Sequence, residues 1–238
     1  MEAELLAWFA ENGRDLPWRR TRDPYAILVC EMMLQQTQVE RVRPRYLAWL
    51  ERWPTVEALA AAPVAEVIRA WQGLGYNRRG LSLHRAARQV AEDGWPAELT
   101  ELPGVGPYTA AALRCFAFGE PVLPVDTNVR RVQRRTRFHF SPAAAQALMD
   151  LGATICLARV PRCDGCPLAD ECPSRGRRYA AVRRQSRFEG SFRQRRAQTL
   201  RLVAEAARPV DDLDAEAVEA LRRDDLVRVA AGVAALPD

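Results

Sequence analysis

Four cysteines in one short segment constrain the fold of this 238-residue chain more than any other feature. They are Cys156, Cys163, Cys166 and Cys172, with the spacing C-x6-C-x2-C-x5-C. Four thiolates so close in sequence predict a loop folded around zinc or an iron–sulfur cluster. The spacing differs from the short run of bacterial ferredoxins and from the two distant CxxC pairs of a zinc ribbon. A structural zinc knuckle is the main alternative, and a disulfide framework is disfavoured because nothing resembles an export signal.

The remaining features indicate an ordinary intracellular globular protein. The other two cysteines, Cys30 and Cys115, lie in apolar runs and are expected to be buried thiols. The length suffices for one large or two small domains with a sizeable core. No segment approaches the roughly 18 uninterrupted apolar residues of a membrane helix. Because residues 2–11 form a mixed-charge helical pattern rather than a leader, we expect a cytoplasmic protein with no membrane partner.

Positive charge is concentrated around the cysteines. Residues 126–201 contain 17 Arg and 6 acidic residues, whereas residues 1–125 contain 14 Arg and 15 acids and residues 202–238 contain 4 Arg and 9 acids. Such a local basic block predicts a polyanionic partner, most simply nucleic acid, although a solvated basic face without a partner is the alternative. The chain has no lysine, so no side chain can form a Schiff base with a sugar aldehyde.

Proline and glycine punctuate a largely helical sequence. Helices are expected over residues 2–12, 24–38, 44–53, 56–61, 63–72, 79–93, 126–135 and 142–157, and residues 97–118 read as helix, hairpin, helix. No alternation typical of strands precedes residue 180, so the fold class is all-α. In the tail, residues 195–207 and 215–223 read as helices, and residues 226–236 as a small hairpin, which would suit a winged-helix remnant.

The segment Leu102–Ala110 has the sequence of a helix–hairpin–helix motif, LPGVGPYTA. Gly104 and Gly106 permit backbone conformations and a close approach that a Cβ atom would prevent. Their N–H groups and the start of the helix at Pro107 would form an anion site suited to a DNA phosphate. A tight helix–helix turn is the alternative. Asp126 follows some twenty residues later at a helix N-cap position, where it can act as a cap as well as a functional carboxylate.

Together these motifs resemble the MutY-type adenine DNA glycosylases, which belong with endonuclease III to the helix–hairpin–helix glycosylases. The cysteine spacing resembles the [4Fe–4S] loop of that group. The match covers roughly residues 8–175, and its motifs occur in the family's order: LPWR at 16–19, EMMLQQTQV at 31–39, GLGY at 73–76, the hairpin, Asp126 and the cysteines.

The resemblance implies a two-lobed fold and specific roles. Residues 20–125 would form a six-helix domain with the hairpin, residues 1–19 and 126–185 an iron–sulfur cluster domain, and residues 186–238 the tail. Glu31 would protonate the departing adenine, and Asp126, with Asn128 nearby, would stabilise the sugar cation. Gln36 would insert into the base stack where the target base leaves, and Tyr76 would contact the opposite base. Tyr108 would stand where the lyase-competent relatives carry their lysine. The remaining implied contacts are the hairpin glycines Gly104 and Gly106 with the DNA phosphate, and an adenine pocket lined by Arg14, Leu16, Trp18 and Gln146.

The residues fit this chemistry. Breaking an N-glycosidic bond requires an acid for the leaving base and a carboxylate near the developing positive charge. Glu31 lies in the apolar run ILVCEMML, where lost hydration favours the protonated carboxyl group, unless a neighbouring Arg pairs with it. Asp126 at a helix N-terminus should stay ionised. The target base must leave the duplex, so the expected partner is double-stranded DNA with a mismatch or oxidised base, bound by a monomer.

Several departures keep other functions open. Asn77 stands where the family often has a second aromatic residue, and Tyr108, Cys115 and residues 116–119 also resemble G:T mismatch glycosylases. The residues from 186 on are too few for the Nudix-like domain of many MutY proteins. The alternatives are therefore a G:T or G:U mismatch glycosylase and a non-catalytic iron–sulfur protein that binds DNA or senses redox state. The pair Glu31 and Asp126 argues against the non-catalytic protein, which needs neither carboxylate.

Overall fold

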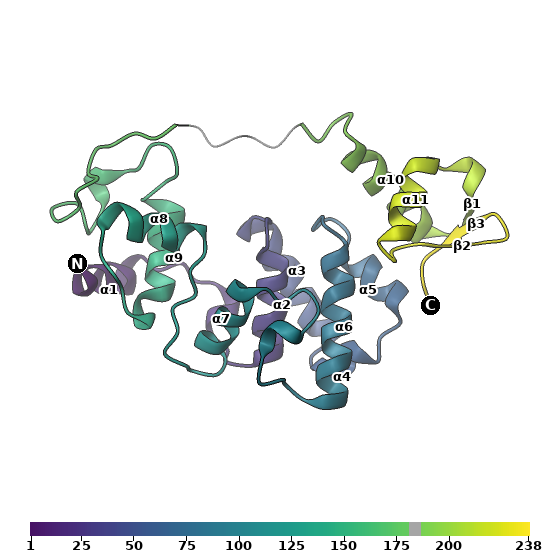
Figure 1. Ribbon diagram of the computed structural model, residues 1–238, viewed down its shortest axis with the longest axis horizontal. Helices are drawn as coiled ribbons and strands as arrows, with labels where there is room; N and C mark the ends of the chain where they lie inside the picture. The colour runs from purple at the N-terminus through teal and green to yellow at the C-terminus, as the bar shows by residue number, and fades with distance from the viewer. Residues whose placement is uncertain (181–186) are drawn as a thin grey trace. The chain divides into compact units, whose positions relative to one another are not determined.

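The computed structural model describes residues 1–180 and 187–238 (Figure 1). The chain divides into two compact units, each built from segments distant in sequence. The cysteine unit contains Met1–Pro24 and Gly106–Arg184, and the helical unit contains Tyr25–Val105 and Gln185–Asp238. The domain limits expected from the sequence stay predictions, because packing does not establish which segments fold alone. The expected limit at residues 185/186 lies outside the described residues.

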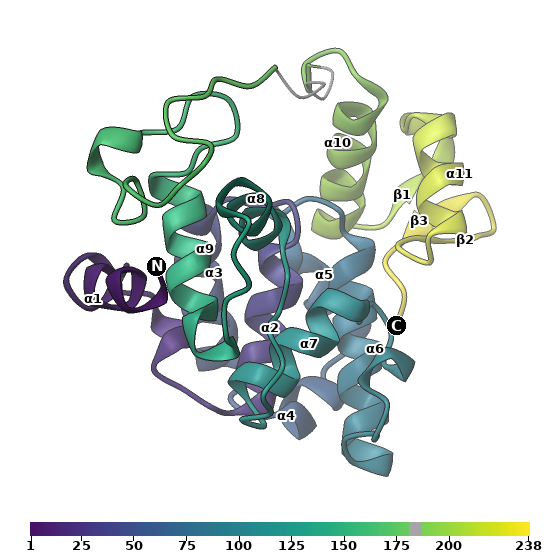
Figure 2. The same ribbon diagram turned by 60° about the vertical axis from the view of Figure 1, so that its left-hand side comes forward.

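The cysteine unit is built on α1 (Glu2–Asn12), α7 (Pro107–Phe116), α8 (Thr127–Thr136) and α9 (Ala145–Thr154). Short 3₁₀ turns at Pro17–Arg19, Pro142–Ala144 and Cys163–Gly165 connect them. α9 packs against both α1 and α8, and α8 lies beside α9 in both views (Figures 1 and 2). Their shared core is apolar and includes Leu5, Val129, Val132, Leu148, Leu151 and Leu168.

The helical unit contains α2 (Pro24–Leu34), α3 (Val39–Arg52), α4 (Val56–Ala60), α5 (Val64–Trp71) and α6 (Arg78–Asp93), followed by a 3₁₀ turn at Leu99–Glu101. α2 is buried on all sides from Tyr25 to Met33, as its largely apolar sequence requires, and Glu31 is the one charged residue in this stretch. α6 packs on α4 and α5 with the small residues Gly80, Ala86 and Ala87 on its buried side. None of the helices in the described residues is long and apolar enough to cross a membrane.

The tail belongs to the helical unit and forms a small module. It contains α10 (Phe192–Glu205), β1 (Arg208–Pro209), a 3₁₀ turn at Val210–Asp212, α11 (Ala215–Arg223), β2 (Arg228–Ala230) and β3 (Val233–Ala235). The antiparallel sheet has the order β1-β3-β2 and lies beside α11 (Figure 2). Apolar residues of α10, α11 and the β2–β3 hairpin pack with Ile68 of α5, and Arg69 Nε donates to the Ala204 carbonyl at 2.9 Å.

The structure confirms the all-α body and the two helices and hairpin of the tail. Several limits differ from the prediction. α3 begins at Val39 rather than Pro44, because Val42 lies on the same buried stripe as Tyr46 and Trp49, and burial of that stripe outweighs the hydrogen bond lost at Pro44. The helix expected before the hairpin is only the turn Leu99–Glu101. β1 was not predicted, since two residues are too few to show a pattern.

Two predicted helices are shorter than expected. α2 ends at Leu34 rather than Gln38, because Gln36 adopts a left-handed conformation with φ 55°. The helix expected over residues 142–157 is a 3₁₀ turn followed by α9, which ends at Thr154. There the Cys156 N–H donates to the Leu151 carbonyl at 2.7 Å and turns the chain into the cysteine loop.

Candidate active site and cysteine loop

Glu31 lies in the last turn of α2 with 7% of its surface exposed. Its neighbours along the helix, from Tyr25 to Met33, are all buried, so the carboxyl group has lost most of its hydration. The hairpin lies close to this part of α2 within the helical unit. A Cβ atom on Gly104 would come within 2.6 Å of Met32 Cε and 2.8 Å of Ser82 Cβ.

The two hairpin glycines serve different purposes. Gly104 has φ 81° and no room for a side chain, so it fits the sequence prediction fully. Gly106 has an extended backbone and is the N-cap residue of α7, and no described atom lies within 4 Å of a Cβ built on it. Gly106 therefore leaves space for a group from outside the chain rather than relieving an internal clash. Tyr108 lies half-buried in the first turn of α7.

Asp126 is the N-cap residue of α8, as the sequence predicts. Its carboxylate accepts hydrogen bonds from the Val129 N–H at 2.6 Å and from Asn128 Nδ2 at 2.9 Å. Both donors fix the orientation of the Asp126 side chain.

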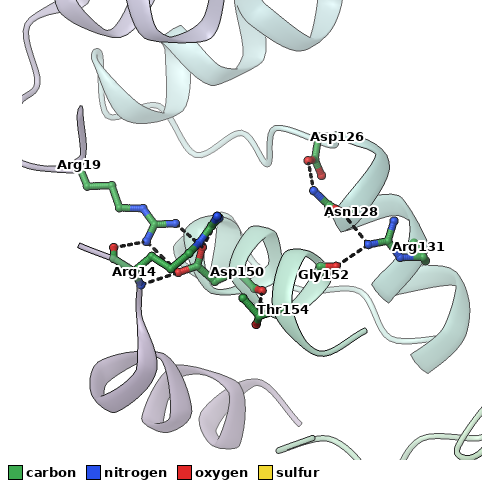
Figure 3. A network of polar contacts seen from close by, with 8 residues as sticks. All are labelled: Arg14, Arg19, Asp126, Asn128, Arg131, Asp150, Gly152 and Thr154. Atoms are coloured by element: carbon green, nitrogen blue, oxygen red, sulfur yellow. Dashed lines mark hydrogen bonds and ion pairs between the residues drawn. The ribbon is translucent and has the colours of Figure 1, made fainter. Parts of the chain in front are cut away.

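Asn128 connects Asp126 to the cysteine loop through Arg131 (Figure 3). Arg131 Nη2 donates to Asn128 Oδ1 at 2.7 Å and to the Gly152 carbonyl at 2.5 Å, and Arg131 Nε donates to the Cys156 carbonyl at 2.7 Å. Gly152 permits this approach of α8 to α9, since a Cβ there would lie 2.5 Å from Asn128 Cβ. Burial lowers the pKa of the Arg131 guanidinium, which remains charged at neutral pH.

A second polar cluster surrounds Asp150, which is fully buried in α9 (Figure 3). Its carboxylate accepts from the Arg14 N–H at 2.9 Å, from Arg14 Nε at 2.7 Å, and from Arg19 Nη1 and Nη2 at 2.8 and 2.7 Å. Burial by itself would raise the pKa of Asp150, but the hydrogen bonds from Arg19 and Arg14 outweigh it and hold the pKa below its ordinary value. The cluster therefore fixes the segment that carries the LPWR motif.

The expected adenine-pocket residues all belong to the cysteine unit. Arg14 is held by Asp150, Leu16 is buried, and Trp18 is half-buried in the turn Pro17–Arg19. Gln146 lies half-buried in α9, one turn before Asp150. α9 thus connects the pocket residues to Asn128 and Asp126 through Asp150 and Gly152, and the roles of these residues in base binding stay predictions.

The expected wedge residues lie in two loops of the helical unit. Gln36 follows α2 and is exposed, and Tyr76 precedes α6 with 48% of its surface exposed. Both have left-handed backbones, with φ 55° and 48°. Such conformations are uncommon outside glycine and are frequent at functional sites.

The four cysteines line a common pocket, together with apolar residues that include Val132, Leu151 and Leu168. All four are free thiols, so the disulfide alternative is not realised in the structure. Within residues 1–180 and 187–238, no three His, Cys, Asp or Glu side chains are close enough to hold a single metal ion. Burial raises the pKa of the Cys166 thiol to about 11, so a thiolate there requires a nearby positive charge such as a metal.

Arg135 is the buried cation of this loop. It donates to Cys156 Sγ at 3.3 Å and to the Leu157 and Ala158 carbonyls at 2.8 and 2.7 Å, and its guanidinium stacks 3.8 Å from the Tyr179 ring centroid. Its Nε atom is buried without an acceptor among the described residues. Four cysteines that line one pocket, a buried guanidinium and a spare N–H group fit an anionic metal–sulfur group.

The sequence patterns did not single out Asp150, Arg131 or Arg135, whose side chains make most of the polar contacts described for the cysteine unit. Among these residues only Asp150 could have been recognised from the sequence. It is the lone acid of the apolar segment Ala143–Ile155, and a buried acid needs a partner. No sequence pattern distinguished the arginines, because a basic block does not reveal which guanidinium groups fold inward.

Comparisons with known proteins agree with this geometry. A model of the HhH-GPD superfamily of base excision DNA repair proteins matches residues 29–152. The chain is 44% identical to the adenine DNA glycosylase of Mycolicibacterium smegmatis over 239 residues, covering 87% of this chain and 81% of the relative. It is 39% identical to the human adenine DNA glycosylase over 212 residues, covering 73% of this chain and 39% of the human protein.

Solved structures give the same fold. A thermostable thymine-DNA glycosylase is similar with a TM-score of 0.65 and 30% identity, covering 72% of this chain and 93% of that one. An endonuclease III in a covalent complex with DNA has a TM-score of 0.62 at 23% identity, with 72% and 92% covered, and shows the shared fold alone. With a family match over half its length and a relative that is 44% identical and covered over 81% of its own length, the chain belongs to the HhH-GPD superfamily of base excision DNA repair proteins.

Proposed function

We propose that this protein is a monomeric, monofunctional DNA glycosylase that hydrolyses the N-glycosidic bond of adenine mispaired with 8-oxoguanine or guanine in duplex DNA. The base is assigned from the similarity to adenine DNA glycosylases, at 44% identity for the first of them. In the reaction the bond between the base and C1′ breaks, water adds to C1′, and the adenine leaves with a proton.

The assignment of catalytic roles rests on the different surroundings of Glu31 and Asp126. Glu31 is buried in an apolar helix, which favours a carboxyl group that can deliver a proton. Asp126 accepts two hydrogen bonds at the N-terminus of α8, which hold its oxygen atoms in a fixed orientation from which they can stabilise a sugar cation. We assign Glu31 as the acid and Asp126 as the electrostatic partner, with Arg14, Leu16, Trp18 and Gln146 in the base pocket.

The base preference is tested by single-turnover reactions on duplexes that contain A:8-oxoG, A:G, T:G or U:G, with alkali to reveal abasic sites. We expect cleavage of the two adenine duplexes. The second candidate, removal of T or U opposite G, is favoured by the 30% identity to a thymine-DNA glycosylase structure. Cleavage of T:G alone would support that candidate and contradict ours, and binding without any cleavage would favour a sensor.

We assign a [4Fe–4S] cluster to Cys156, Cys163, Cys166 and Cys172. When bound, such a cluster would fix the loop that carries exposed arginines such as Arg159 and Arg162, rather than take part in base release. Protein purified without air should contain iron and acid-labile sulfide in near-equal amounts, and Cys166→Ser should lose both together with DNA affinity. Stoichiometric zinc without sulfide would contradict the assignment.

The exposed arginines of this loop should bind phosphates. Arg162 is exposed, whereas Arg175 pairs with Asp170 at 2.8 Å. We expect Arg162→Ala to weaken binding to all duplex sequences alike and to reduce the slope of log affinity against log salt by about 1. Arg222→Ala, in the acidic tail, is the matched control and should change neither. A loss confined to one mismatch would show that Arg162 recognises bases instead.

The enzyme should stop at the abasic site, because a β-lyase needs an amine and the chain has no lysine. Strand scission should require alkali or heat, and borohydride should trap no adduct with DNA. Tyr108→Lys should introduce weak strand cleavage if this side chain faces the sugar. A trapped adduct formed by the unmodified enzyme during turnover would contradict the proposed mechanism.

A further inference from the structure

Arg79 occupies a position that its own helix disfavours. It is the second residue of α6, and neither it nor Arg78 is matched by an acidic residue in that first turn. Cations at a helix N-terminus oppose the helix dipole, and acidic residues are preferred there. An arginine in the first turn of a helix, against this preference, is expected where contacts with another part of the structure require it.

The guanidinium of Arg79 binds the end of a different helix. Arg79 Nη1 donates to the Met32 carbonyl at 2.9 Å, to the Met33 carbonyl at 3.4 Å, and to the Gln35 carbonyl. The Met32 and Met33 carbonyls belong to the last turn of α2, where helical carbonyls lack partners and a cation is favourable, and Gln35 directly follows the helix. Arg79 therefore binds the C-terminal end of α2, which stops two residues before Gln36.

The other side of the same guanidinium binds the GLGY loop. Arg79 Nη2 donates to the Gly75 carbonyl at 3.1 Å, to the Leu74 carbonyl at 3.4 Å, and to Thr37 Oγ1 at 3.2 Å. The Thr37 hydroxyl itself lies 3.3 Å from the Leu74 carbonyl and donates to it. One planar group thus joins the loop after α2 to the loop before α6.

These two loops carry Gln36 and Tyr76, both exposed and both with positive φ. A left-handed backbone is unfavourable for a non-glycine residue and persists only where the surroundings hold it. The bonds from Arg79 fall on the residues adjacent to both positions, namely Gln35, Thr37 and Gly75.

The charge of Arg79 has no carboxylate partner among the described residues, where its acceptors are carbonyl and hydroxyl oxygens. The Trp71 and Tyr76 rings lie 5.7 and 5.3 Å from the guanidinium carbon. Burial lowers the pKa of Arg79, which stays protonated at neutral pH. Lysine cannot reproduce this contact set, because an ammonium group has three donors around one point and no planar fork.

We infer that Arg79 is a positioning residue that holds the Gln36 and Tyr76 loops in one preset arrangement, so that both side chains enter the base stack together when the target nucleotide is displaced. This inference rests on the proposed wedge roles of Gln36 and Tyr76. Without the Arg79 hydrogen bonds the two loops must become ordered while the base is being displaced. The entropy lost in this ordering then slows base displacement rather than bond cleavage.

The test compares two substrates for each variant. One duplex holds the target base in its mismatch, and the other holds the same nucleotide in an unpaired bulge, where little unstacking is needed. For Arg79→Ala and Arg79→Lys we expect the single-turnover rate to fall roughly 10²-fold on the mismatch and much less on the bulge. Arg78→Ala is the matched control, because Arg78 is the adjacent arginine with a 71% exposed side chain, and it should behave as wild type.

Base displacement is followed separately by the fluorescence of 2-aminopurine placed beside the target base. Arg79 variants should bind the mismatch duplex without the fluorescence increase seen with wild type. Thr37→Val, which removes only the hydroxyl group between the loops, should give a smaller change in the same direction and covers the case in which Arg79→Ala does not fold. Equal losses on both duplexes, or wild-type rates for Arg79→Lys on the mismatch, would overturn the inference.

The outcome is distinguishable from failure of the proposed function. If wild type releases thymine rather than adenine, the adenine assignment fails, and the same comparison is made with T:G and a thymine bulge. If wild type releases no base, the fluorescence change on binding alone decides whether Arg79 sets the loops.

Discussion

Replacing Glu31 by Gln should lower the rate of base release by about 10³-fold or more while duplex binding is retained. The amide has nearly the same shape as the carboxyl group and fits the buried position in α2, where only 7% of Glu31 is exposed. It cannot deliver a proton to the departing base, so the leaving group must depart as an anion. Single-turnover kinetics on the A:8-oxoG duplex would measure the loss, and a gel-shift titration would measure binding.

Glu40→Gln is the matched control for this change. Glu40 is an exposed acid in the first turn of α3, so the same substitution there removes a carboxylate without touching the buried helix. We expect wild-type rates for Glu40→Gln. Base release by Glu31→Gln at the wild-type rate would show that another group protonates the base, and a loss of binding equal to the loss of rate would show a structural role for Glu31.

Replacing Asp150 by Asn should destabilise the folded protein by about 3–5 kcal/mol, because two arginines would keep their charge beside a buried neutral amide. Asp150 is fully buried, and the side chains of Arg14 and Arg19 are only 31% and 13% exposed. For a chain of this size the melting temperature should fall by about 6 to 20 °C, as measured by circular dichroism. Asp170→Asn breaks the exposed pair with Arg175 and should shift melting little.

The Asp150 effect should depend on pH in a defined direction. The pKa of Asp150 is held below its ordinary value, so its contribution to stability is present above the unfolded pKa of about 3.9 and is lost as pH falls through the folded value. The difference in melting temperature between wild type and Asp150→Asn should therefore shrink as pH is lowered from 6 to 3. A difference that stays constant over this range would show that packing, and not charge, holds the cluster.

Sequence reasoning succeeded where local chemistry decides the outcome. Asp126 was predicted as the N-cap of α8, and α11 was predicted to span Ala215–Arg223, because capping residues and apolar periodicity act within a few positions. It failed at the start of α3 and the end of α2. Pro44 is a favourable helix start by itself, and Gln35 to Gln38 could continue a helix, but distant contacts decide both limits.

By itself the sequence determined the helical fold class, the hairpin glycines, the N-cap Asp126 and the cysteine loop, because these depend on residue type and spacing along the chain. Only the tertiary structure decided which arginines fold inward. Arg131, Arg135 and Arg79 are indistinguishable in sequence from exposed arginines such as Arg159 and Arg162. Their partners are backbone carbonyl groups, as of Cys156, Leu157 and Gly75, and every residue has one. Which carbonyl remains unpaired near which guanidinium depends on where the helices end in space, and no residue pattern encodes that.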